Sequence, residues 1–248
     1  MHAFGMSGRH LILAEYPLRV NPLKMAFSGK PFIQNYAWRP EEGTKFQVID
    51  RETGALRGTY ETEAFFCFHH VNAFERGGEL VVDLIAYDDP SIIDALYLEA
   101  DQPRGPRPST ELRRYVIDLE GGGVSWEKLA EDVELPRIDY GRHNGRPYRY
   151  AYCSRSKDSW FDQLVKVDVS GGEEAVWSSP RCHPGEPIFV REPRADGEDA
   201  GVVLSVVLDA AAGRSFMLIL DARSFEELGR AEAPHHIPFG FHGQFLRA

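Results

Sequence analysis

The residues of this chain that could do chemistry are histidines and carboxylates rather than nucleophiles. The sequence has nine histidines and three cysteines, with no HExxH motif and no Cys/His spacing typical of a zinc module. Two histidine positions are unusual: His69 stands beside His70 in the apolar run FFCFHHVNAF, and His242 lies in IPFGFHGQF between Gly240 and Gly243. An imidazole in such apolar surroundings needs a hydrogen bond or a metal ion.

Two glutamates have a similar setting. Glu134 lies in VELPRIDY and Glu186 in HPGEPIFV, each beside a proline and an apolar run, where an unpaired carboxylate is costly. A metal-bound histidine offers a partner, because its second ring N–H needs an acceptor. The pattern therefore indicates one site with imidazole ligands, which suits Fe, Zn, Cu or Ni. Core histidines bonded to carbonyl oxygens, with strand-end glutamates bonded to backbone amides, are the alternative.

Short β-strands must position these side chains. Runs rich in Val, Ile, Leu, Phe and Tyr recur between turn residues, which predicts an all-β chain. Alternation along a strand sends His69 and His70 to opposite faces, so only one of them can face a given centre. The one helix we expect covers about 90–100, and 101–109 is expected to be an exposed loop. The predicted strands are 11–18, 45–50, 65–74, 79–87, 114–119, 148–153, 163–169, 187–191, 201–209 and 215–221.

A weak internal repeat runs through these strands. A strand that ends in an aspartate before a turn recurs at Asp50, Asp118, Asp168 and Asp221, with spacings of 68, 50 and 53 residues. Periods near 40–50 residues with several strands each are typical of β-propeller blades. The same pattern ends ordinary hairpins, because aspartate caps turns locally. At about 50 residues per blade, the chain has room for four or five blades.

The composition restricts the partners and the compartment. The 248 residues are 43% hydrophobic, enough for a real core, and the formal net charge of −10 gives no general attraction to nucleic acid. The three cysteines are far apart in sequence, which suits a reducing compartment, and the N-terminus does not read as a signal peptide. We expect a cytoplasmic protein with no transmembrane helix. Peripheral membrane contact through a small apolar patch stays compatible with the acidic balance.

At these same residues the chain resembles the carotenoid cleavage oxygenase family, in family order over essentially all 248 residues. An ordered set of segments is far more specific than any single motif. The resemblance implies a seven-bladed β-propeller with a dome of helices and loops, of which this chain supplies about four to five blades, a few dome loops and a short helix. The matching segments are HAFGMS at 2–7, FCFHHVNAFE at 66–75, ELPRIDY at 134–140, PGEPIFV at 184–190, DAGVVLSVVLD at 199–209 and PFGFHGQF at 238–245.

The resemblance also implies a site, in which four histidines hold Fe(2+) on the propeller axis and glutamates bond three of them. By motif, His2, His69 and His242 resemble iron ligands, and Glu134 and Glu186 resemble the bonded glutamates. One departure is an alanine at position 3, where the family has a serine after the ligand. The other histidines match no ligand position and are expected to be structural or exposed: His10, His143, His183, His235 and His236.

The implied activity is that of a nonhaem Fe(II) dioxygenase, which uses O2 to cleave a conjugated C=C bond of a carotenoid or apocarotenoid into aldehyde or ketone products. A stilbene-cleaving member and a retinyl ester isomerohydrolase are alternatives within the family. The family's first iron histidine and about half of its propeller belong to sequence upstream of residue 1, so residues 1–248 are expected to be the C-terminal portion of one domain. A further alternative is a truncated half-propeller, inactive without its N-terminal half.

Overall fold

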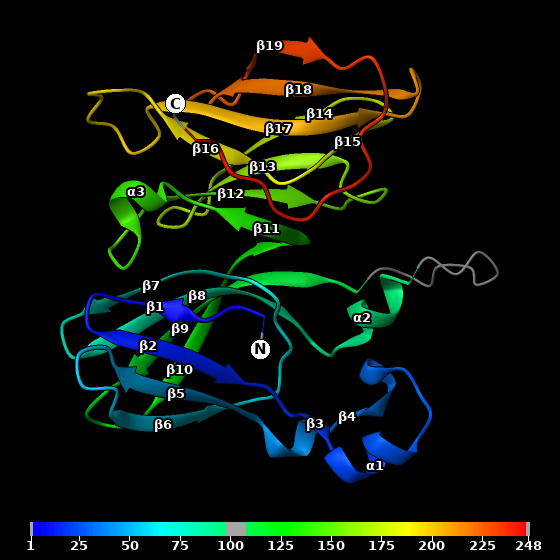
Figure 1. Ribbon diagram of the computed structural model, residues 1–248. Helices are drawn as coiled ribbons and strands as arrows, with labels where there is room; N and C mark the ends of the chain where they lie inside the picture. Colours follow the sequence, from blue (N-terminus) through cyan, green and yellow to red (C-terminus); the bar gives the residue numbers. More distant parts are fainter. Residues whose placement is uncertain (1, 98–107, 247–248) are drawn as a thin grey trace.

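Antiparallel β-sheets make up most of the chain in the computed structural model, which describes residues 2–97 and 108–246 (Figure 1). The strands form four main sheets that follow one another along the sequence. The expected all-β class is confirmed. Sheet 1 contains β1 (Gly5–Met6), β2 (His10–Glu15), β5 (Thr44–Asp50) and β6 (Leu56–Thr62). Sheet 2 contains β7 (His70–Arg76), β8 (Glu79–Tyr87), β9 (Thr110–Asp118) and β10 (Val124–Glu131).

The second half of the chain repeats this order. In sheet 4, two short strands share the first position, because both pair with β17. Sheet 3 contains β11 (Val133–Arg137), β12 (Tyr150–Arg155), β13 (Gln163–Asp168) and β14 (Glu174–Ser178). Sheet 4 contains β15 (Cys182–Pro184), β16 (Ile188–Arg191), β17 (Gly201–Asp209), β18 (Arg214–Asp221) and β19 (Glu227–Glu232).

The aspartate repeat has a structural origin. Each of its four aspartates ends the third strand of its sheet, and each carboxylate accepts hydrogen bonds from the amides two and three residues later. The turn then leads into the fourth strand. Asp209 makes the same turn after the second strand of sheet 4, so the motif caps a hairpin wherever it occurs. The aspartate recurs along the sequence because the same arrangement of strands recurs in each of the four sheets.

Short insertions interrupt the sheets. Between β2 and β5 the chain forms β3 (Leu18–Val20), α1 (Pro22–Phe27), η1 (Phe32–Asn35), β4 (Tyr36–Trp38) and η2 (Pro40–Glu42). The remaining helices are α2 (Ser91–Ala95), between β8 and β9, and α3 (Tyr140–His143), after β11. No helix among the described residues is both long and apolar enough to cross a bilayer.

The expectation of a single helix at 90–100 was wrong in number and length. Helix α2 covers only Ser91–Ala95, and residues 98–107, which include most of the expected loop, lie outside the described part. Helix α1 was missed because its six residues are too few to show a helical period. Asn21 caps its N-terminus, and the side-chain oxygen of Asn21 accepts the amides of Leu23 and Lys24 at 3.0 and 3.1 Å.

The expected strand 65–74 begins later than predicted. Strand β7 starts at His70, and the residues before it make only an isolated bridge between Phe66 and Tyr87. His69 therefore lies just outside the regular ladder.

Successive sheets pack face to face, which explains the apolar runs in the sequence. Strand β8 is buried on both faces: Leu80 and Val82 belong to the core between sheets 1 and 2, whereas Val81 and Ile85 belong to the core between sheets 2 and 3. A third core fills the space between sheets 3 and 4. A strand between two cores has no solvent face, so its pattern is nearly continuous rather than alternating.

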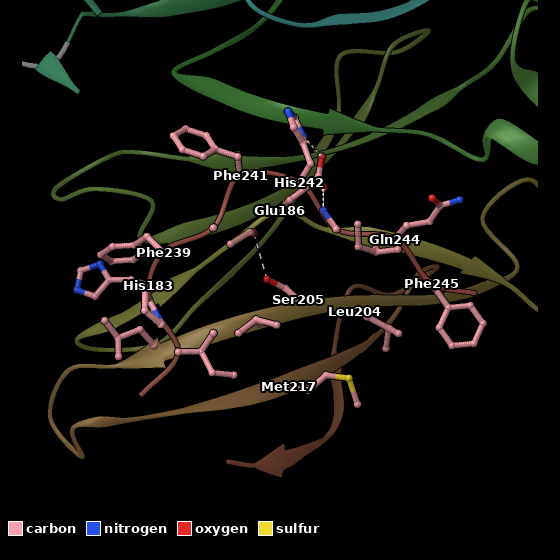
Figure 2. A pocket seen from close by; sticks show the side chains of 18 residues that line it. His183, Glu186, Leu204, Ser205, Met217, Phe239, Phe241, His242, Gln244 and Phe245 are labelled. Atoms are coloured by element: carbon pink, nitrogen blue, oxygen red, sulfur yellow. Dashed lines mark hydrogen bonds and ion pairs between the residues drawn. The ribbon is translucent and has the colours of Figure 1, made fainter. Parts of the chain in front are cut away.

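The outer face of sheet 4 is not covered in this way. Val206 and Met217 pair directly across β17 and β18 and are 46% and 40% exposed. The segment after β19 crosses part of this face, and the two enclose a cavity of about 340 Å³ that is lined mainly by apolar side chains (Figure 2).

A buried ion pair on sheet 2, between Asp83 of β8 and Arg114 of β9, is hydrogen-bonded to residues that flank the strands of sheet 3. Asp83, fully buried on β8, accepts two hydrogen bonds from the Arg114 guanidinium at 2.9 and 2.8 Å and one from the Tyr148 hydroxyl at 2.6 Å. Arg114 also donates to the Val169 carbonyl. Burial opposes the charge of Arg114, but the Asp83 carboxylate outweighs it and raises the pKa of Arg114, so the guanidinium stays charged.

We expect Asp83→Ala to lower the free energy of unfolding by about 3–5 kcal/mol, because it leaves a buried guanidinium without its counterion. Urea denaturation followed by circular dichroism measures this. Asp88→Ala is the matched control, since the Asp88 side chain is 92% exposed and its pair with Arg113 should contribute little. Equal, small effects of both changes would contradict the prediction.

Candidate metal centre

The first strand of each sheet contributes to one cluster of side chains. His2 lies just before β1, His69 just before β7, Glu134 on β11 and Glu186 between β15 and β16. His242 belongs to the segment after β19, which runs back toward β11 and the N-terminus (Figure 1). The fold thus brings together all five residues that the sequence singled out.

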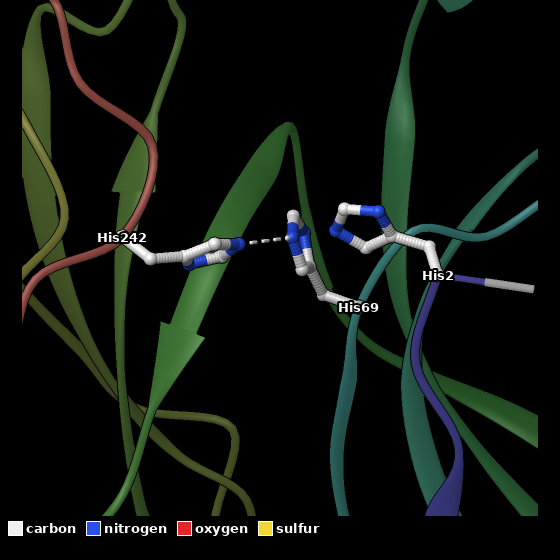
Figure 3. Close-up of side chains that lie close together, drawn as sticks. All are labelled: His2, His69 and His242. Carbon is white, nitrogen blue, oxygen red and sulfur yellow. Dashed lines mark hydrogen bonds between the residues drawn. The ribbon is translucent and has the colours of Figure 1, made fainter.

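Three imidazoles meet at the centre of this cluster (Figure 3). One ring nitrogen of each of His2, His69 and His242 lies within 4.8 Å of those of the other two. The rings of His69 and His242 have centroids 5.0 Å apart, and their Nε2 atoms are 3.2 Å apart. The His2 ring lies 5.1 Å from that of His69 and 6.1 Å from that of His242.

Buried carboxylates fix two of these rings. His69 Nδ1 lies 2.5 Å from Glu134 Oε2, and His242 Nδ1 lies 3.0 Å from Glu186 Oε1. Since a carboxylate only accepts, each Nδ1 carries the proton and each Nε2 presents its lone pair to the centre. Both glutamates are buried, at 7% and 8% exposure.

Further donors hold each glutamate in place. Glu134 also accepts the Tyr87 hydroxyl and the Leu135 amide, both at 2.7 Å. Glu186 accepts the Gly243 amide at 2.8 Å. At Glu134 the backbone itself is adapted, because Leu135 has a positive φ of 51° and the pairing of β11 shifts between Glu134 and Arg137.

The donor set fits a divalent metal ion. Two Nε2 atoms 3.2 Å apart need either a shared proton or a metal cation between them. For imidazole–metal distances of about 2.1 Å, nitrogens of neighbouring ligands lie about 3.0–3.4 Å apart. Burial, with smaller contributions from His69 and His242, lowers the pKa of His2, which keeps this imidazole neutral as a ligand requires.

The other histidines are engaged elsewhere. Burial and the neighbouring His69 lower the pKa of His70 to about 4, and its buried ring nitrogens find no hydrogen-bond partner among the described residues. His10 contacts Glu75. The remaining positions, none in the cluster, are His143 and His183, bonded to carbonyl oxygens, and the exposed His235 and His236.

Two residues that hold the glutamates were not predicted from the sequence. Tyr87, at the end of β8, donates to Glu134, and Arg137, on β11, contacts both Glu186 and the Gly243 carbonyl. Arg137 stands in the ELPRIDY segment, so the motif contained a signal for it. Tyr87 had none, because its partner is 47 positions away.

The all-β fold thus brings three imidazoles together and bonds two of them to buried glutamates, an arrangement that could hold a divalent metal ion. A family model described as retinal pigment epithelial membrane protein matches residues 1–247. The chain belongs to this family, as the sequence resemblance predicted.

Curated relatives bear names of carotenoid enzymes. The mitochondrial carotenoid-cleaving dioxygenase of Macaca fascicularis is 35% identical over 292 residues, covering 99% of this chain and 52% of that protein. The human β,β-carotene 15,15′-dioxygenase is 33% identical, with 99% and 52% covered. Among solved structures, the cobalt-substituted Synechocystis ACO is 26% identical with a TM-score of 0.88, covering 99% of this chain and 52% of that one. The chain thus spans about half the length of the relatives it matches.

We expect Glu134→Gln to weaken metal binding about 10–100-fold, because a neutral amide replaces the carboxylate that accepts the Nδ1 proton of His69 and offsets the charge of the metal. Anaerobic titration with Fe(II) or Co(II) measures the affinity. Glu127→Gln, at an exposed position on β10, is the control and should bind as the unaltered chain does. An unchanged affinity in Glu134→Gln would argue that this hydrogen bond does not serve a metal ligand.

Proposed function

We propose that this chain carries most of the iron site of a nonhaem Fe(II) dioxygenase that cleaves a conjugated C=C bond of a carotenoid or apocarotenoid into aldehyde or ketone products. The observation that carries the proposal is the convergence of His2, His69 and His242, with Glu134 and Glu186 behind two of them. The names of the relatives supply the substrate class.

In this proposal the three imidazoles bind the iron and the two glutamates orient the rings and offset its positive charge. Bound iron supplies the activation of O2 for its addition across one C=C bond, which then splits into two carbonyl groups. The protein's part is to exclude water and to hold one double bond of the polyene at the site.

Apolar surfaces beside the imidazoles suit such a substrate. Phe68 lies 5.4 Å from the His2 ring and packs against Phe66 and Tyr87. A polyene has no hydrogen-bonding groups along its chain, so aromatic and aliphatic walls are what its binding requires.

We also propose that the four sheets are consecutive blades of a seven-bladed propeller, and that residues 1–248 form the C-terminal portion of that single domain. The likeness to the Synechocystis structure and the coverage of only 52% of its length support this. The exposed outer face of sheet 4 supports it too, because the next blade would cover Val206 and Met217.

The proposal predicts bound Fe(II) and carbonyl products when the protein is incubated with O2 and a panel of carotenoids, apocarotenoids and stilbenes. His69→Ala and His242→Ala should abolish cleavage, whereas the exposed His236→Ala should not. Liquid chromatography with mass spectrometry identifies the products and the bond cleaved. Cleavage of stilbenes alone would assign a stilbene-cleaving activity, and an iron-free protein that leaves every compound intact would overturn the proposal.

A second candidate is a half-propeller that is inactive without its N-terminal half. The apolar side chains exposed on the outer face of sheet 4 and on β19, including the 61% exposed Leu228, favour it. Size-exclusion chromatography and iron analysis of the 248-residue chain discriminate the two, because a stable, iron-loaded and active monomer excludes this candidate.

We further propose peripheral membrane contact for uptake of the polyene, through the insertion that contains α1 and η1. Leu23, Phe27 and Phe32 are 74%, 87% and 63% exposed there. The neighbouring Lys24 and Lys30 can meet anionic headgroups. Large apolar side chains at such exposure cost less when buried at a lipid interface.

We expect Phe27→Ser to weaken binding to vesicles of phosphatidylcholine and phosphatidylserine about tenfold or more, since burying such a side chain contributes about 1.5–3 kcal/mol. Sedimentation of the protein with vesicles measures it. Leu56→Ser, at a 59% exposed apolar position on β6, is the control. Equal binding of Phe27→Ser and the unaltered chain would remove the membrane proposal.

For the compartment we propose the cytoplasm. The three cysteines are free and buried, and burial raises the pKa of Cys67 and Cys153, so these thiols stay protonated as a reducing compartment allows.

A further inference from the structure

His242 lies on a weakly supported part of the site. Its side chain is 47% exposed, against 13% for His69, and residues 238–246 form neither helix nor strand. The hydrogen bonds from this segment to the rest of the described chain end on three residues: His69, Glu186 and Arg137. The position of His242 therefore depends on very few contacts.

Arg137 contacts both the backbone beside His242 and the glutamate that faces its ring. Its Nη2 donates to the Gly243 carbonyl at 3.1 Å, and its Nη1 lies 3.8 Å from Glu186 Oε1, the oxygen that also faces His242 Nδ1. The guanidinium lies 5.5 Å from the centre of the Tyr140 ring, which restricts its motion. One side chain thus holds both the backbone next to His242 and the carboxylate that orients its ring.

The position of Arg137 on β11 links the two halves of the site. Glu134, three residues earlier on the same strand, orients His69. Any displacement of β11 moves the acceptor of His69 and the anchor of His242 together. Strand β11 therefore contributes to the positions of both imidazoles.

Two effects of Arg137 on a bound cation oppose each other. Its positive charge repels a divalent ion and draws on the charge of Glu186, which weakens binding. Its hydrogen bond keeps the His242 segment in place. This strengthens metal binding, because the segment has already lost its conformational entropy before the metal binds. If a substitution of Arg137 weakens metal binding, the hydrogen bond dominates; if it strengthens metal binding, the charge dominates.

We propose that Arg137 is a positioning residue for His242, and that its anchoring of the Gly243 carbonyl outweighs its repulsion of the metal. The inference rests on the proposed metal site. Arg137→Met removes the hydrogen bond and the charge at similar length, whereas Arg137→Lys keeps a cation that can donate to the same carbonyl.

The test uses the full 248-residue chain and has two measurements. Hydrogen exchange of the metal-free chain reports the anchoring directly, and residues 238–246 should exchange faster in Arg137→Met and near the original rate in Arg137→Lys. Anaerobic Co(II) titration reports the affinity and the visible absorption of the bound ion. We expect Arg137→Met to bind Co(II) about tenfold more weakly, or worse, with an altered spectrum, and Arg137→Lys to bind within about threefold.

The exposed Arg57→Met on β6 is the matched control and should change neither measurement. Tighter Co(II) binding in Arg137→Met would show that the charge dominates and would overturn the inference, as would unchanged exchange of residues 238–246. If the unaltered chain binds neither Co(II) nor Fe(II), the proposed metal site itself fails. If it binds them and Arg137→Met behaves identically, only the role of Arg137 fails.

Discussion

The hydrogen bonds from His69 and His242 to Glu134 and Glu186 are the interactions on which the site depends. They place the proton of each ring on Nδ1 and thereby turn two unprotonated Nε2 atoms toward each other at 3.2 Å. Without a proton or a metal cation between the two Nε2 atoms, that arrangement costs free energy, because the lone pairs repel and two carboxylates are buried. A divalent ion offsets both costs, so the chemistry of the donor set and the identity of the family lead to the same kind of site.

The architecture of the sheets makes this convergence achievable. Each sheet follows the chain from its first strand to its last, and neighbouring sheets are held together by apolar cores and by buried hydrogen bonds such as that from Tyr148 to Asp83. Because His2, His69, Glu134 and Glu186 all lie on or beside a first strand, stacking the sheets brings together residues that are far apart in the sequence. The packing of the cores therefore sets the distances at the site.

The two histidine–glutamate pairs are not equivalent. Glu134 has a neutral hydroxyl, that of Tyr87, as its further side-chain partner, whereas Glu186 lies near the guanidinium of Arg137. His69 is fixed at the start of a strand, while His242 lies on a segment held by a few polar contacts. The site thus combines His69, which is firmly packed, with His242, whose segment is held by Arg137. Arg137 lies on β11, the strand that also carries Glu134, the partner of His69.

The sequence by itself determined the all-β class, the aspartate turns and four of the five site residues as unusual, because apolar surroundings make an imidazole or a carboxylate conspicuous. His2 could be assigned only through the family resemblance, since a histidine beside a two-residue strand leaves no pattern. The start of β7 at His70, the short helix α1 and the roles of Tyr87 and Arg137 were decided by the tertiary structure. The start of β7 and the roles of Tyr87 and Arg137 depend on partners on other strands, and local propensity carries no information about which strands become neighbours. Helix α1 depends on its cap, and it is too short to show a helical period.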